Sequence, residues 1–221
     1  KDGGGQYQSI YGDKLKKVTY WTEEDFKTGR VFESDIPLDT RILLDRYSDS
    51  DEPSKDHREL FFDIEVEVTD GFPEPAKANN KVTSVAMHTK HDDKYYVCVL
   101  GDRDPSLPLL ADKKGTLIKF FSNESDLLQA FLRFWIQFKP TVITGWNING
   151  FDVPYLYNRI SKVLGEEFAN ALSPIQIVKY NPNKKMYRIA GVSALDYMDL
   201  YKKFTFTQQS SYRLDHIGTI E

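Results

Sequence analysis

Residues 60–66 read Leu-Phe-Phe-Asp-Ile-Glu-Val, and this stretch decides the fold and points to the chemistry. Apolar residues surround the first acid, which is typical of a strand in the interior of a sheet. Because side chains alternate in direction along a strand, Asp63 and Glu65 share one face and the apolar residues between them share the other. Two like charges this close repel each other, and a divalent cation held by both would offset that repulsion. The alternative is an exposed edge strand that carries two solvated acids.

A third acid stands where another strand meets a helix. The β-branched strand at 141–144 ends at Gly145, a turn rich in Gly and Asn follows, and Asp152 lies at the start of the next helix. Taken alone, Asp152 could simply cap that helix. Together with Asp63 and Glu65 it offers carboxylates from different strand and helix ends, which is how a site for two metal ions is assembled.

The order of predicted elements indicates an α/β fold. Alternating apolar residues recur in several strands before a long helix at 124–138, which Asn123 can cap, and a second helix is expected at 153–163. Asp196 and Asp199 are expected to cap a short helix near residue 200. Strands first, followed by alternation of strands and helices, predict a mixed sheet with helices packed against it. The predicted strands are 60–68, 82–87, 95–100, 117–121, 141–144, 175–180, 186–189 and 192–195, and two short helices are predicted at 200–206 and 214–220.

The composition is that of a globular protein. The chain has 221 residues, of which 40% are hydrophobic and 28% charged, with a formal net charge of −4. These values exclude a disordered or collagen-like chain, and no apolar stretch approaches the ~18 residues of a membrane span. Cys98 is the only cysteine, which favours a reducing compartment. The acidic balance argues against binding of nucleic acid by bulk charge, but not against an enzyme that grips it through metal ions in a local cleft.

The N-terminal quarter of the chain differs from the rest. At ~150 residues per domain, the length allows one full core and a smaller lobe. Two short strands at 7–11 and 15–21 and a helix that begins after Thr22 are predicted there. The polar segment 48–54 is predicted to be a linker or loop.

Three segments, found in order, resemble the exonuclease region of family B DNA polymerases. Their sequences resemble most the T-even-like bacteriophage type. They read FFDIEVEVTDGFPEP (61–75), TGWNINGFDVPYLYNRI (144–160) and LDYMDLYKKFTFTQQSSYRLDHI (195–217). The resemblance implies an α/β fold of the RNase H-like type, a mixed β-sheet with flanking helices, for residues 59–221. Residues 1–58 would be a small, partial, β-rich N-terminal domain of the polymerase.

The resemblance further implies a proofreading 3′→5′ exonuclease that removes nucleotides from single-stranded or frayed DNA 3′ ends by two-metal-ion hydrolysis. The implied cofactors are two divalent cations, Mg²⁺ or Mn²⁺. Asp63 matches a ligand of both ions, Glu65 a ligand of the ion that activates water, and Asp152 a ligand of the ion on the leaving-group side. The implied partners are the single-stranded DNA 3′ end, the remainder of the polymerase chain or a split-gene partner, and replication accessory proteins, with no membrane. The implied location is the cytoplasm of a bacterial host cell during phage infection.

Three further residues are expected to contact DNA, namely Phe72, Asn147 and Phe151. Phe72 matches an aromatic residue that wedges beside the terminal base, and stacking of this kind is worth ~1–3 kcal/mol per base. The structural alternatives are that Phe72 packs on its own loop and that Asn147 only forms a turn.

The third exonuclease motif of the family, Tyr-x3-Asp, is not found in these 221 residues. Tyr212 and Asp215 are separated by two residues rather than three, and His216 is followed by Glu221 where a His-x4-Asp motif would need an aspartate. The polymerase motifs Ser-Leu-Tyr-Pro-Ser and Asp-Thr-Asp are also absent, so no DNA synthesis is expected. The exonuclease domain would then be truncated before its third motif. The alternative function is a catalytically incomplete DNA-binding or assembly fragment of a split or truncated polymerase, which needs a second chain to supply that motif.

Overall fold

The computed structural model describes residues 5–9, 11–18, 20–32, 34–53, 55–69, 71–104 and 115–221. Contacts divide the chain into two compact units, residues 1–54 and 55–221, and each is considered separately. The boundary falls at the end of the polar segment predicted as a linker, whose residues 48–53 contain no helix or strand. Its last residue, Ser54, lies outside the described residues. The assignment of residues 1–58 to a partial polymerase domain stays a prediction.

The first unit contains two short strands and two helices. They are β1 (Tyr7–Gln8), antiparallel to β2 (Lys14–Leu15), α1 (Glu23–Lys27) and α2 (Leu38–Tyr47). Thr22 caps α1 as predicted, because its hydroxyl accepts the Asp25 N–H and the Asp25 carboxylate accepts the Thr22 N–H. The strands are shorter than predicted, and residues 10 and 19 of the predicted strands lie outside the described residues. Helix α2 was not predicted, and its apolar residues do not form one buried face, since Ile42, Leu43 and Leu44 are all exposed.

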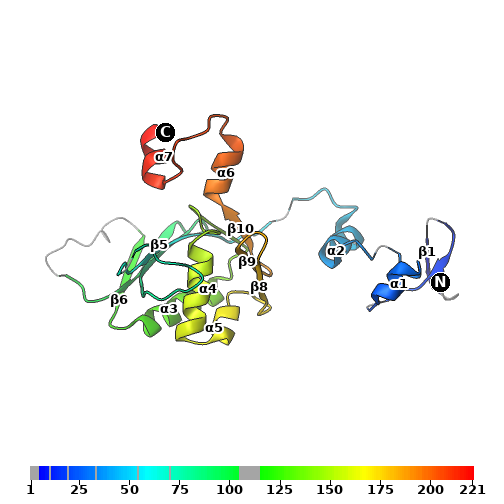
Figure 1. The fold of residues 1–221 in the computed structure, drawn as a ribbon, viewed down its shortest axis with the longest axis horizontal. Helices are drawn as coiled ribbons and strands as arrows, with labels where there is room; N and C mark the ends of the chain where they lie inside the picture. Colours follow the sequence, from blue (N-terminus) through cyan, green and yellow to red (C-terminus); the bar gives the residue numbers. More distant parts are fainter. Residues whose placement is uncertain are drawn as a thin grey trace. The chain divides into compact units, whose positions relative to one another are not determined.

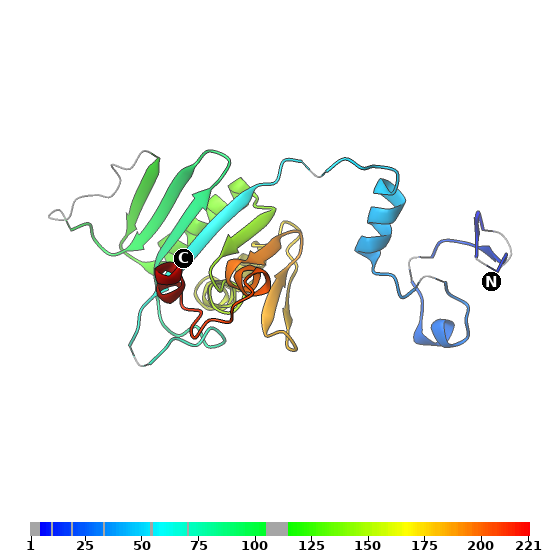
Figure 2. The same cartoon turned by 90° about the horizontal axis from the view of Figure 1, so that it is seen from above.

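The second unit is built on one six-stranded mixed sheet, which confirms the predicted α/β class. The strand order is β10-β7-β3-β4-β5-β6 (Figure 2). Strand β4 is antiparallel to both of its neighbours, whereas the β10–β7, β7–β3 and β5–β6 pairs are parallel. The bounds are β3 Glu59–Val66, β4 Val82–Thr89, β5 Lys94–Leu100, β6 Thr116–Phe121, β7 Val142–Gly145 and β10 Ser193–Asp196.

Helices lie on both sides of this sheet. Helices α3, α4 and α5 lie on one side, and α6 and α7 lie on the other (Figure 1). A small antiparallel hairpin, β8 with β9, stands beside the sheet. The bounds are α3 Glu124–Phe138, α4 Asp152–Val163, α5 Glu166–Asn170, β8 Val178–Asn181, β9 Met186–Ile189, α6 Tyr197–Phe204 and α7 Leu214–Ile220. Helix α5 was not predicted, and α6 begins three residues earlier than expected. Within the described part of the chain, none of the helices is long and apolar enough to cross a bilayer.

The core lies between the sheet and helices α3 and α4. On β3 the residues Leu60, Phe62 and Ile64 are buried in alternation. The Phe62 ring meets Trp135 of α3 edge-on, at 6.1 Å between ring centroids. Burying a side chain of this size contributes roughly 1.5–3 kcal/mol, so this face cannot turn outward. The prediction that Asp63 and Glu65 share the other face of β3 is confirmed, and the edge-strand alternative is wrong because β3 lies between β7 and β4.

Candidate active site

Two of the predicted site residues stand on the open face of β3. Asp63 and Glu65 are both exposed in part and are separated by one residue that points into the core. Desolvation of its carboxyl and, secondly, the charge of Glu65 raise the pKa of Asp63. The strand thus presents two negatively charged carboxylates that repel each other.

The neighbouring strand β7 stops short, and this leaves room for a third acid. Its parallel register with β3 ends at the pair Phe61 and Thr144. Gly145 follows, and a Cβ atom there would lie 2.5 Å from the Phe62 carbonyl oxygen. Only glycine therefore allows the two backbones to approach this closely. Beyond this point, β3 backbone groups that face β7 must find partners other than the β7 ladder.

Asp152 supplies such a partner. Its Oδ1 accepts the N–H of Ile64 at 3.0 Å, so the carboxylate lies beside the peptide group that joins Asp63 to Ile64. Asp152 is the first residue of α4, and the residue before it, Phe151, is the N-cap. The alternative that Asp152 serves as the helix cap is therefore wrong. Its side chain instead binds the backbone of the strand that carries the other two acids.

Asp152 is also the most strongly perturbed acid of this region. The residue is only 3% exposed. Burial above all, and then the charges of Asp63 and Asp196, raise its pKa to about 7, against the opposing effect of the Ile64 N–H. When no cation is present, Asp152 therefore keeps its proton to a higher pH than an ordinary aspartate does. A buried acid held among other acids is an arrangement that a cation would stabilise.

Asp196 holds the turn that leads into Asp152. Its carboxylate accepts the N–H groups of Asn147 at 3.0 Å and Asn149 at 2.9 Å. It also accepts the Met198 N–H at 3.0 Å, which makes it the N-cap of α6 as predicted. The tertiary role in the turn was not predicted, because it depends on β10 lying next to β7. Asn147 adopts a left-handed φ of 60° in this turn, which is a conformation that asparagine tolerates.

A hollow of about 370 Å³ lies next to this turn. It is lined by Asn147, Asn149, Gly150, Lys184, Lys185, Met186, Asp196 and Asp199. The two lysines come from the connection between β8 and β9 and bring positive charge beside the acids of α6. The Oδ1 atom of Asn149 is buried and has no hydrogen-bond partner among the described residues. The hollow therefore offers two cationic side chains to a polar ligand.

Phe72 stands at the tip of the connection between β3 and β4. It is 82% exposed, yet its ring contacts Phe151 at 5.4 Å between centroids. Phe151 in turn stacks on Tyr155 of α4 at 5.4 Å. Phe72 thus packs on the residue that precedes Asp152 rather than only on its own loop. The neighbouring Asp70 of the same motif lies outside the described residues.

The structure brings the three predicted acids to one place but does not arrange them as a finished metal site. Among the described residues, no group of three or more His, Cys, Asp or Glu side chains is arranged so that it could hold a metal ion. The donors nevertheless suit a hard divalent cation, because Asp63, Glu65 and Asp152 offer only oxygen atoms and the repulsion between them needs a positive charge. The metal-ligand and DNA-contact roles of the site residues stay predictions.

The sequence matches the family described as DNA polymerase family B, exonuclease domain, over residues 33–217. This match covers most of the chain, and the chain belongs to that family. It is an α/β exonuclease domain of a family B DNA-directed DNA polymerase. Exonuclease domains of this family generally depend on divalent metal ions.

The similar proteins include DNA polymerases of phages, of eukaryotes and of viruses that infect eukaryotes. The chain is 39% identical to the DNA-directed DNA polymerase of Escherichia phage RB69 over 72% of its length, and 37% identical to that of Enterobacteria phage T4 over 71%. It is 35% identical to the DNA polymerase delta catalytic subunit of Dictyostelium discoideum, again over 71%. The chain spans 20% of the length of each phage enzyme and 14% of the Dictyostelium subunit. The domain is thus of the T4-like type.

Proposed function

We propose that this domain is a 3′→5′ exonuclease that removes nucleotides from single-stranded or frayed DNA 3′ ends, as the proofreading part of a phage DNA polymerase. The observation that carries the proposal is the position of Asp152, which is buried against β3 with its pKa raised to about 7 by burial and by the neighbouring carboxylates. A purely structural acid would have its carboxylate satisfied by several N–H groups, as Asp196 has, or by a cationic side chain, as Glu124 has. This one has Asp63 and Asp196 as charged neighbours instead.

Asp63, Glu65 and Asp152 would hold two divalent cations, Mg²⁺ or Mn²⁺. Bound cations would lower the pKa of a water molecule and offset the charge that develops on the oxygens of the cleaved phosphodiester. The protein's own contribution is to fix the ligands. The Ile64 N–H orients the Asp152 carboxylate, and β3 keeps the other two carboxylates on one face. Asp152 would have to be deprotonated to hold a cation.

The DNA end would lie between the exposed Phe72 and the turn of Asn147. Phe72 offers a free aromatic face for stacking, which does not depend on base identity. The hollow beside Asn147 brings Lys184 and Lys185 within reach of the phosphate backbone. A mismatched end unpairs more easily than a matched one, so selectivity for errors would come from fraying before the strand enters the site.

The direct test uses a 5′-labelled single-stranded oligonucleotide with the purified chain in Mg²⁺ or Mn²⁺. We expect stepwise shortening from the 3′ end, and a loss of at least about 10³-fold in the Asp63→Ala, Glu65→Ala double variant, because groups that act as a unit are lost together. Glu167→Ala is the control, since Glu167 is an exposed acid on α5. Equal activity of wild type and double variant would contradict the proposal.

A second candidate function is a DNA-binding or assembly fragment whose site another polypeptide completes. It is favoured by the absence, among the described residues, of a group of three acids arranged to hold a metal. This alternative predicts that the chain alone leaves DNA intact, and that addition of a second polypeptide with the Tyr-x3-Asp segment of the family restores shortening. If the isolated chain is already active, or if the mixture stays inactive, this alternative is excluded.

A further inference from the structure

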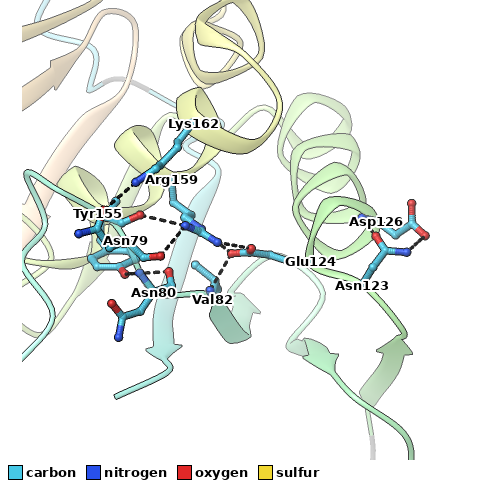
Figure 3. Close-up of polar contacts among 10 residues, drawn as sticks. Asn79, Asn80, Val82, Asn123, Glu124, Asp126, Tyr155, Arg159 and Lys162 are labelled. Carbon is cyan, nitrogen blue, oxygen red and sulfur yellow. Dashed lines mark hydrogen bonds and ion pairs between the residues drawn. The ribbon is translucent and has the colours of Figure 1, made fainter. Parts of the chain in front are cut away.

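One side of helix α4 binds the loop that carries Phe72. The same face of the helix carries four polar residues, spaced by three, one and three positions. They are Tyr155, Asn158, Arg159 and Lys162. All four bind the segment 75–80 of the β3–β4 connection, and Figure 3 shows three of them with their partners. The helix that begins with Asp152 thus also holds the loop of the proposed base-stacking residue.

Arg159 is at the centre of this contact. Its guanidinium donates to the Ala78 carbonyl at 3.0 Å and to the Asn79 carbonyl at 2.9 Å. It also forms a two-pronged ion pair with Glu124 of α3, through bonds of 2.8 and 2.6 Å (Figure 3). Both residues are only 8% exposed. One carboxylate oxygen of Glu124 additionally accepts the N–H of Val82, the first residue of β4, at 2.8 Å. The pair therefore ties both helices to the end of the loop.

The loop needs this support because its backbone is strained. Ala78 is fully buried and has a φ of 42°, in the left-handed region that a residue with a Cβ rarely adopts. Such conformations persist only where the surroundings determine them strongly. Here the Ala78 carbonyl is bound by Arg159, and the flanking Asn80 exchanges two backbone bonds with the Tyr155 hydroxyl, at 3.1 and 2.9 Å.

Stability alone is a poor explanation for the ion pair. A buried pair of charges often contributes no more than apolar residues of the same size would. What Arg159 adds is a fixed, fork-shaped set of donors that defines the path of two carbonyl groups. The tip of the same loop places Phe72 on Phe151, directly before Asp152. The position of the stacking residue relative to Asp152 is thus set through α4.

We propose that Arg159, held by Glu124, is a positioning residue that keeps Phe72 beside Asp152 to receive the terminal base of the DNA strand. The proposal rests on the proposed exonuclease function. It assigns Arg159 no contact with DNA or with metal ions. Its effect is on recognition of the 3′-terminal base rather than on hydrolysis.

The first measurement compares two single-stranded oligonucleotides that differ only at the 3′ end, one complete and one without the terminal base. Wild type should bind the complete strand at least about fivefold more tightly, because stacking on Phe72 is lost with the base. In the Glu124→Leu, Arg159→Met double variant this ratio should fall to about one, as it should in Phe72→Ala. Arg133→Met is the matched control, since Arg133 is an exposed arginine on α3 that does not belong to this contact, and it should keep the wild-type ratio.

The ratio does not depend on the fraction of folded protein, so it separates positioning from stability. Arg159→Lys serves as a second variant that retains the charge opposite Glu124 but cannot reach both carbonyls. It should also lose most of the ratio, with a melting temperature close to that of wild type. A wild-type ratio in a folded Arg159→Lys or double variant would overturn the proposal.

A second measurement needs no DNA. With 4-fluorophenylalanine in place of Phe72, the ¹⁹F spectrum should show one sharp signal in the wild-type background and a shifted or broadened one in the double variant. An unchanged spectrum would overturn the positioning role whether or not DNA binds. If instead wild type itself does not distinguish the two oligonucleotides while the ¹⁹F signal responds as expected, the loop is anchored as proposed and the proposed DNA function is at fault.

Discussion

Glu124 and Asp152 are both buried acids at the start of a helix, and the comparison between them separates structure from chemistry. Glu124 has a guanidinium and a backbone N–H bound to its carboxylate. Asp152 accepts the Ile64 N–H of β3, and its charged neighbours are Asp63 and Asp196. The first acid is balanced by the fold itself, whereas the second either keeps a proton or needs a cation from outside. Burial alone therefore does not mark a candidate functional acid, whereas burial among like charges does.

The largest expected effect follows from removing the charge of the unbalanced acid. Asp152→Asn keeps an oxygen for the Ile64 N–H but cannot serve as a charged ligand. We expect nuclease activity to fall by at least about 10³-fold, because the ligands act as a unit. Without metal, the variant should be at least as stable as wild type at pH 8, because a buried charge has been removed. A marked loss of stability would mean that the carboxylate is structural.

Removing a partner from the balanced acid should do the opposite. Arg159→Met leaves Glu124 buried without its counter-charge, and we expect a loss of about 3–5 kcal/mol in the free energy of unfolding. The Glu124→Leu, Arg159→Met double variant should recover most of this loss. Urea unfolding of the wild type and of both variants measures the difference. A double variant no more stable than the single variant would show that the ion pair is not what balances Glu124.

Asp152 should also make the stability of the chain depend on pH. The pKa of Asp152 is about 7 in the folded chain, above its ordinary value, so the folded state binds a proton that the unfolded state releases. Without metal, the contribution of Asp152 to stability is therefore present below about pH 4 and is lost as the pH rises to about 7. Because a cation needs the deprotonated form, affinity for Mn²⁺ should fall about tenfold from pH 8 to pH 6.

Calorimetric titration with Mn²⁺ at the two pH values checks the affinity, and melting temperatures in EDTA check the stability. Asp152→Asn serves as the control, since its melting temperature should vary less between pH 5 and pH 8 than that of wild type. An Mn²⁺ affinity that is independent of pH over this range would contradict the raised pKa.

The smallest effect is expected at the loop tip. Phe72→Ala should change the free energy of unfolding by no more than about 0.5 kcal/mol, because the side chain is 82% exposed. Its affinity for a single strand should nevertheless fall at least about fivefold, through the loss of stacking. Fluorescence anisotropy with a labelled oligonucleotide measures this change. A large loss of stability with unchanged affinity for DNA would show that Phe72 has a structural role and does not bind DNA.

Local sequence patterns were enough to predict the strand that carries Asp63 and Glu65 and the helix that begins with Glu124. The alternation of Leu60, Phe62 and Ile64 placed Asp63 and Glu65 on the other face of β3, and the periodicity of α3 gave its length. The α/β class followed from the order of these elements. Helices α2 and α5 were missed because neither combines a clear apolar face with a strong cap.

The partners of Glu124 and Asp152 could not be predicted, because they depend on contacts between residues that are far apart in the sequence. Glu124 and Arg159 lie 35 positions apart, and Ile64 and Asp152 lie 88 apart. No local pattern links either pair, because each contact arises from the strand order and from the place where β7 stops. The role of Asp196 in the Asn147 turn was missed for the same reason.

The central claim is that Asp63, Glu65 and Asp152 form a site for divalent cations. The most direct measurement is anomalous diffraction from crystals of this chain soaked in Mn²⁺ at pH 8, where Asp152 is deprotonated. We expect at least one Mn²⁺ peak bonded to both Asp63 and Asp152, and loss of that peak in Asp152→Asn. Well-occupied Mn²⁺ peaks elsewhere with none between these two carboxylates would contradict it.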